Sequence, residues 1–223
     1  FSIPISMLMV FLAFMIVSTD YVGPQKDISS CESDDQIQVI CDFINSEDIV
    51  ITPDKKFLFM SQMGSIAPWG ENESGYFAIM DLSNNKKIIP KITLEENTWG
   101  EETCSRKDDD EYGPHGIDLV ERNDGRYQIG VISHHPKESV EMFELKKNDL
   151  SWEIIWRGCV NVPDKFYFND LSLKKDGSFY ASHMYKRDIT MNEWFMIALL
   201  KSNSGNIVFW ENSNFTEIEG SEG

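Results

Sequence analysis

Histidine is scarce in this sequence, and its positions give the first indication of chemistry. The chain of 223 residues has four histidines, and three of them, His115, His134 and His135, fall between residues 114 and 136. Imidazole titrates near neutral pH without help from its surroundings, which suits it to general base catalysis. An isolated histidine is more often a structural or a surface residue than a catalytic one. These segments alone therefore leave a catalytic and a structural interpretation open.

Oxygen-bearing side chains accompany strand-like sequence in two other places. Glu47 and Asp48 open the first run of β-branched residues, and Asn169 and Asp170 follow an aromatic run at 166–168. Calcium takes about six to eight hard oxygen ligands, which such side chains at the ends of buried strands can supply. An Asn-Asp pair is also ordinary turn chemistry. Either pair alone is a weak signal, but beside the histidines they favour a site.

The sequence between these segments predicts short strands divided by turns. Strand-like runs lie at residues 49–52, 57–60, 76–82, 116–121, 127–133, 140–145, 152–157, 166–173, 179–182, 195–200 and 207–210. Four such strands in roughly 40–50 residues make the repeat of a β-propeller blade. No amphipathic helix is predicted outside the N-terminal segment. We therefore predict an all-β fold, and the length allows about four blades.

The charge of the chain limits its partners. The formal net charge is −17 at pH 7, with 37 acidic and 20 basic residues. Nucleic-acid phosphates and anionic lipid surfaces would be repelled, so nucleic acid is excluded as a partner. The acidic run at 108–111 is predicted to be an exposed loop. With 41% hydrophobic residues, the chain can bury one sizeable core or two small ones.

The N-terminal segment differs from the rest of the chain. Residues 7–17 are an unbroken apolar run, shorter than the roughly 20 residues of a membrane-spanning helix but suited to a signal peptide. We interpret residues 1–19 as a signal peptide or an uncleaved signal anchor, 20–45 as a linker and 47–223 as the β domain. Because the chain starts at Phe1 without a basic segment, we expect a few upstream residues.

Export would permit disulfides and glycans. The four cysteines show no CxxC spacing, which argues against a zinc knuckle or a thioredoxin-type motif. Asn72 and Asn214 begin N-glycosylation acceptor triplets. We therefore predict a secreted or extracytoplasmic glycoprotein with disulfides.

Five motifs, read in order, resemble the paraoxonase/arylesterase family. They are Ser46-Glu47-Asp48, Pro114-His115-Gly116-Ile117, His135-Pro136 with Ser139-Val140-Glu141, Asn169-Asp170 and Phe179-Tyr180-Ala181. The resemblance runs from about residue 47 to the end of the chain. It implies a six-bladed β-propeller with two calcium ions in its central tunnel. About four blades fit this length and six do not, so either the natural chain is longer and this sequence is a fragment, or the propeller interpretation is wrong.

The family's calcium ligands carry over residue by residue. Glu47 and Asn169 match ligands of the catalytic calcium. Asp48, Asp170 and the backbone carbonyl of Ile117 match ligands of the structural calcium.

The resemblance also assigns a histidine dyad. His115 matches the general base, and His135 matches its partner because it directly precedes Pro136. His134 stands where the family usually has Asn, so the partner's position could differ by one residue. Where the family tends to have an Asp-His pair, this chain has His183 as the nearest match.

The function implied is calcium-dependent hydrolysis of a small lactone or aryl ester. Calcium would polarise the carbonyl, and the dyad would activate water. A non-catalytic propeller used for binding, and a sugar-lactonase or strictosidine-synthase-like enzyme, are the alternatives. The resemblance further implies that the N-terminal segment associates with a lipid or membrane surface. It implies one disulfide from Cys31 or Cys41 to a partner in the last blade, beyond Gly223.

Overall fold

The computed structural model describes residues 30–147 and 152–223. The chain divides into two compact units, residues 1–41 and 42–223. In the first unit, Cys31 is bonded to Cys41, with Cα atoms 6.0 Å apart. The prediction that Cys31 or Cys41 pairs with a partner in the last blade is therefore wrong for this structure, because the two cysteines are bonded to each other. The predicted leader at residues 1–19 lies outside the described residues.

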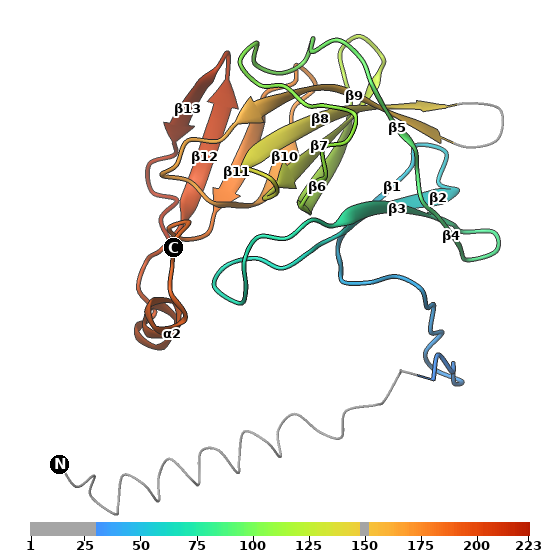
Figure 1. Cartoon of the computed structure of the whole chain (residues 1–223), viewed down its shortest axis with the longest axis horizontal. Coiled ribbons are helices and arrows are strands. Elements are labelled where there is room, and N and C mark those ends of the chain that lie inside the picture. The colour runs from blue at the N-terminus through green and yellow to red at the C-terminus, as the bar shows by residue number, and fades with distance from the viewer. Residues whose placement is uncertain (1–29, 148–151) are drawn as a thin grey trace, which may run out of the picture. The chain divides into compact units, whose positions relative to one another are not determined.

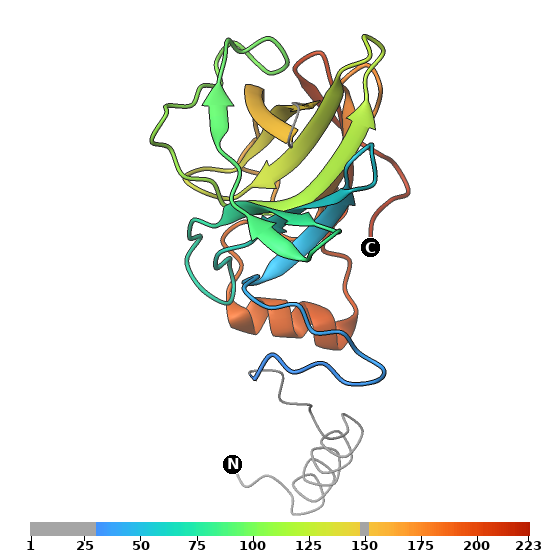
Figure 2. The same ribbon diagram turned by 90° about the vertical axis from the view of Figure 1, so that its right-hand side faces the viewer.

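The second unit is mostly β and contains three sheets (Figures 1 and 2). The first sheet holds β1 (Ser46–Ile51), β2 (Phe57–Gln62), β3 (Tyr76–Asp81) and β4 (Lys86–Ile88). The central sheet has the order β5-β9-β8-β7-β6 and holds β5 (Ile92–Leu94), β6 (Pro114–Glu121), β7 (Tyr127–Ser133), β8 (Ser139–Lys147) and β9 (Trp152–Asn161). The third holds β10 (Phe168–Leu173), β11 (Phe179–His183), β12 (Asn206–Glu211) and β13 (Asn214–Glu217).

Each sheet is built on an antiparallel meander of four consecutive strands. The exception is β5, which adds to the central sheet parallel to β9. An antiparallel four-strand meander is the form of a propeller blade. The described residues contain no closed barrel, and the number of blades in the whole protein stays a prediction.

Two apolar cores join the sheets face to face. Phe59 and Phe77 of the first sheet pack against Phe143 of the central sheet. On the other side, a second buried cluster joins the central and third sheets and includes Met142 and Phe179. Neighbouring residues of a strand point to opposite faces, so β8 serves both cores with Met142 and Phe143. Burial on both faces therefore explains the apolar runs from which such strands are predicted.

Aspartates fasten the first strands of the sheets side by side. Oδ2 of Asp48 in β1 accepts a hydrogen bond from the Ile117 amide in β6, at 2.8 Å. Oδ2 of Asp118 in β6 accepts one from the Leu173 amide in β10, at 2.7 Å. The strand β6 thus lies between β1 and β10, so residues far apart in sequence meet at one end of these three strands.

A second disulfide pins the loop after β5 to the central sheet. Cys104 is bonded to Cys159 of β9, with Cα atoms 5.5 Å apart. Both cysteines are buried. Within the described residues no cysteine is free, which fits the prediction of a disulfide-containing protein.

The predicted strand at 195–200 is wrong, because α2 (Met191–Leu200) occupies this stretch. The helix has a capping box, in which the Thr190 side chain accepts from the Glu193 amide and the Glu193 side chain accepts from the Thr190 amide. Its apolar residues are largely exposed, Phe195 and Leu199 among them. No helix in the described ranges is long and apolar enough to cross a membrane. The short strands β4, β5 and β13 were also not predicted.

The stability of the N-terminal cap of α2 is expected to depend on pH. Bonds from Lys186 and Thr190 lower the pKa of Glu193 from 4.5 to about 2. A carboxyl group whose pKa is depressed by folding stabilises the folded form at high pH and loses this effect as pH falls through the folded pKa. Hydrogen-exchange protection of the Thr190 amide, which donates to the Glu193 carboxylate, should therefore fall between about pH 4.5 and pH 2, and Glu193→Gln should abolish this dependence. Equal protection at both pH values would contradict the assignment.

Candidate active site

Irregular pairing brings the predicted site residues to the same end of the three sheets. The register shifts between Ser46 and Asp48 in β1, between Pro114 and Ile117 in β6, and between Phe168 and Leu171 in β10. Bulges of this kind re-aim side chains and are frequent beside active sites. The predicted residues Glu47, His115 and Asn169 fall within these three irregular stretches.

Glycine allows two of these strands to approach closely. A Cβ atom at Gly116 would lie 2.5 Å from the carbonyl oxygen of Asn169 and 2.5 Å from Cα of Asp170. Real Cβ atoms do not tolerate such contacts with backbone. The backbone of β6 therefore touches β10 directly beside His115.

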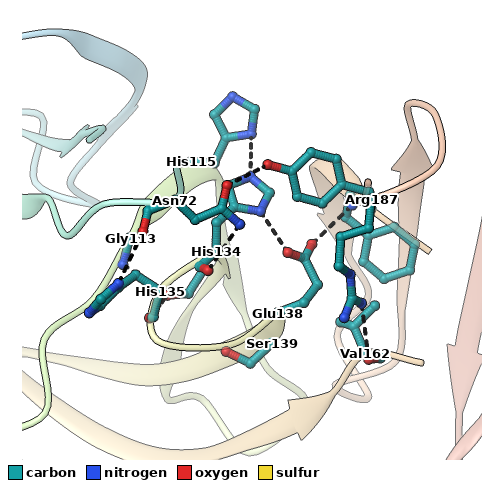
Figure 3. A network of polar contacts seen from close by, with 12 residues as sticks. Asn72, Gly113, His115, His134, His135, Glu138, Ser139, Val162 and Arg187 are labelled. Carbon is teal, nitrogen blue, oxygen red and sulfur yellow. Dashed lines mark hydrogen bonds and ion pairs between the residues drawn. The ribbon is translucent and has the colours of Figure 1, made fainter. Parts of the chain in front are cut away.

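Two buried histidines meet at this point. Nδ1 of His115 lies 3.1 Å from Nε2 of His134, and both residues are at most 3% exposed. Nε2 of His115 lies 3.3 Å from Oε1 of Glu47. On its other side, Nδ1 of His134 lies 2.7 Å from Oε2 of Glu138. Figure 3 shows His134 between His115 and Glu138. The four side chains form a continuous polar chain from β1 to Glu138, the residue directly before β8.

The structure corrects the predicted partner of His115. His135 faces away: its Nδ1 lies 3.4 Å from the carbonyl oxygen of Asn72 and its Nε2 lies 3.9 Å from Glu111. Its side chain is 31% exposed. Consecutive side chains of an extended segment point in opposite directions, so His134 and His135 cannot both face His115. The prediction took the histidine directly before Pro136 as the dyad partner. It is off by one position, because His134 faces His115.

Several contacts fix the orientation of His134. The Tyr167 ring covers it, with ring centroids 4.6 Å apart. The His134 amide donates to the Gly113 carbonyl at 2.9 Å. Asn72 donates from its side chain to the His134 carbonyl at 3.5 Å and accepts from the Tyr167 hydroxyl at 3.0 Å. The sequence indicated Asn72 only as a glycosylation acceptor, yet its side chain links His134 to Tyr167 in this site.

The carboxylates beside His115 repel one another. Burial, and then the negative charges of Asp48 and Asp170, raise the pKa of Glu47 from 4.5 to about 7. Burial and the charges of Asp48 and Asp118 likewise raise the pKa of Asp170. A bound cation would relieve this repulsion. The donor set of oxygens therefore has the chemistry of a hard-metal site.

His115 is held in its neutral form. Burial, followed by the charge of His134, lowers its pKa from 6.5 to about 3, against the opposing effect of a backbone hydrogen bond with Phe168. A general base must be unprotonated before it acts. The burial that makes His115 neutral therefore meets this requirement, although a pKa so far below neutrality also makes its imidazole a weak base.

Comparison with known proteins decides the family. The family model described as Arylesterase matches residues 44–222, which include every predicted site residue. The chain belongs to the arylesterase family. No curated protein matches this chain. The resemblance inferred from the five motifs is thus confirmed, and membership in the arylesterase family supports an ester hydrolase.

Three of the predicted calcium ligands of this arylesterase-family chain are carboxylates that lie near one another. Glu47, Asp48 and Asp170 are close enough for the negative charge of one to raise the pKa of another. Asp48 already accepts from the amides of Ile49 and Ile117. Across the two described ranges, no three side chains of His, Cys, Asp or Glu are grouped as a metal site. The calcium sites remain predictions.

Glu138 and Tyr167 are the residues of this site that sequence reasoning missed. Glu138 stands four residues after His134, in the same segment as the histidine motif, and Tyr167 lies in the aromatic run before Asn169. The spacing of four residues between His134 and Glu138 is the signal that the sequence contains for this contact. Nothing in the sequence indicates that the Tyr167 ring covers His134.

Proposed function

We propose that this arylesterase-family chain forms part of a calcium-dependent hydrolase of aryl esters and lactones. The observation that carries the proposal is the contact between buried, neutral His115 and Glu47, one of a group of mutually repelling carboxylates. A proton acceptor and a cation-binding group side by side are the two parts that metal-assisted ester hydrolysis needs. A non-catalytic propeller would have no use for this combination.

The predicted ligands fit calcium by the chemistry of their donors. Glu47 and Asn169 would hold the catalytic ion, and Asp48, Asp170 and the Ile117 carbonyl would hold a second, structural one. When bound, calcium supplies polarisation of an ester carbonyl and stabilisation of the oxyanion. Since the carboxylates repel one another without a cation, the ion would also stabilise this end of the strands.

The histidines supply the proton transfer in this proposal. His115 takes a proton from the attacking water, and His134 fixes the direction of its ring through the contact at 3.1 Å. Tyr167 and the buried ends of β6 and β10 exclude bulk water around the dyad. General base catalysis of this kind is typically worth about 10²- to 10⁴-fold in rate.

The architecture supports a propeller as the setting of this site. Three meanders present their first strands β1, β6 and β10 side by side, and the site residues stand on those strands. In a propeller the first strands line the central tunnel, where residues from distant blades converge. We propose the six-bladed form for the whole protein, and a secreted or extracytoplasmic location, which the disulfides support. We also propose a lipid-associated N-terminal segment.

Calcium removal tests the function. We expect the full-length protein to hydrolyse phenyl acetate and a lactone, to lose most of both activities in EDTA, and to regain them when calcium is added back. Magnesium is the matched control, because it demands smaller and more regular coordination and should restore little activity. Full activity in EDTA would contradict the calcium role, and no hydrolysis of either substrate by the calcium-loaded protein would contradict the proposed function.

A further inference from the structure

Glu138 is a buried carboxylate that contacts the dyad without belonging to it. Its side chain is 1% exposed. Oε2 lies 2.7 Å from Nδ1 of His134, and Oε1 accepts a hydrogen bond from the Phe168 amide at 3.1 Å. Among the described contacts its partners are an imidazole and a backbone amide. The buried Glu141, in contrast, is paired with Arg106.

We propose that Glu138 is a positioning residue that fixes the tautomers of both histidines, so that Nε2 of His115 is the basic nitrogen. This inference rests on the proposed function. It assigns the general base to one atom and gives the dyad a third member, Glu138, from the start of β8.

The assignment follows from what each group can donate. A carboxylate only accepts, so the contact with Glu138 requires a hydrogen on Nδ1 of His134. With one hydrogen on each ring, Nε2 of His134 then has a lone pair. The hydrogen in the 3.1 Å contact between the imidazoles must therefore come from Nδ1 of His115. This leaves the lone pair of neutral His115 on Nε2.

That nitrogen lies where the proposed chemistry needs it. Nε2 of His115 is 3.3 Å from Oε1 of Glu47, a predicted ligand of the catalytic calcium. Glu47 is also a carboxylate and favours the opposite set of tautomers, with hydrogen on Nε2 of His115, but its contact is longer than the 2.7 Å contact between Glu138 and His134. We therefore assign the tautomers that satisfy Glu138, which leave the base on Nε2 of His115. A carboxylate behind a histidine fixes its tautomer in the same way in other general-base systems.

A purely structural role for Glu138 would not require it to fix the tautomers of the histidines. The bond from the Phe168 amide ties the start of β8 to β10 and occupies only Oε1. The Phe168 backbone also contacts the His115 ring, which makes it a competing acceptor for the His115 hydrogen. The tautomer of His115 therefore distinguishes the positioning role from a merely structural one.

Glu138→Gln reverses the hydrogen-bond pattern with little change in shape. The Gln carbonyl would still accept from the Phe168 amide, and its NH₂ group would face His134, whose Nδ1 must then be unprotonated. In the calcium-loaded full-length protein, we expect kcat for phenyl acetate to fall about 100-fold while KM changes less than about threefold. The ¹⁵N shifts of His134 and His115 should change from Nδ1–H to Nε2–H forms. Glu138→Asp, which keeps the carboxylate, should recover part of kcat.

Glu144→Gln is the matched control. Glu144 is a buried carboxylate of β8 that binds Arg157 at 2.6 Å, so its variant should change neither kcat nor the histidine tautomers. Unchanged tautomers and kcat in Glu138→Gln, or an Nε2–H form of His115 in the unaltered protein, would overturn the proposal. The tautomer of His115 in the unaltered protein tests the proposal even if Glu138→Gln fails to fold. If the unaltered protein hydrolyses no ester, the proposed function fails, while the tautomers still test the role of Glu138.

Discussion

His115→Gln should lower kcat for esters and lactones by about 10²- to 10⁴-fold, the usual value of a general base. Glutamine can keep a hydrogen bond to His134 but cannot accept the proton of water. The affinity for calcium should stay within a few-fold, because His115 contacts Glu47 without being a predicted ligand. Steady-state kinetics in saturating calcium, together with a calcium titration by calorimetry, would measure both effects. An unchanged kcat would remove His115 from the mechanism.

The two adjacent histidines provide the sharpest control for that experiment. His134→Gln should reduce kcat at least tenfold, because its ring holds His115 at 3.1 Å. His135→Gln should have little effect, because its side chain is 31% exposed and points to Asn72 and Glu111. The reverse result would support the partner predicted from the sequence and contradict the geometry of the structure.

The strands could be predicted from the sequence because burial imposes a simple pattern on them. In β7, Ile129 and Val131 contribute to one core and Ile132 to the other, which yields the apolar run that indicates a buried strand. The stretch that forms α2 has a similar apolar run, and periodicity does not separate a short buried strand from a helix. The capping box of Thr190 and Glu193 was the signal that identifies the helix.

The candidate site could be predicted in its types of residue but not in its contacts. The motifs indicated His115, Glu47 and the carboxylates. Which of His134 and His135 faces inward depends on where β7 ends and how the loop turns at Pro136. Asn72 meets Tyr167 across 95 positions of sequence. Contacts at that separation arise from the packing of sheets, which local sequence does not record.

The disulfides show the same limit. Four cysteines permit several pairings, and spacing alone does not choose among them. The pair Cys104–Cys159 forms across 55 residues because the loop after β5 folds back onto β9. That return also buries Arg106, next to the loop that carries His134 and His135.

Arg106 and Glu141 form a buried ion pair behind the histidines. Their side chains are 1% and 0% exposed. Oε1 of Glu141 accepts from Nε and Nη2 of Arg106 at 3.0 and 2.7 Å, and Oε2 accepts from the Trp156 indole at 2.8 Å. Arg106 also donates to the carbonyl of His135 at 3.4 Å. The pair therefore neutralises a buried charge and supports the turn that positions His134.

Arg106→Met should destabilise the protein by about 3–5 kcal/mol, because it leaves the Glu141 carboxylate buried without its cation. Urea unfolding would measure the free energy. Arg126→Met is the matched control: Arg126 pairs with Asp124 where both side chains are about 40% exposed, and such surface pairs contribute about 1 kcal/mol or less. Adding Glu141→Gln to Arg106→Met should restore part of the loss, because the charge is then absent. Equal, small losses in Arg106→Met and Arg126→Met would show that the buried pair does not stabilise the fold.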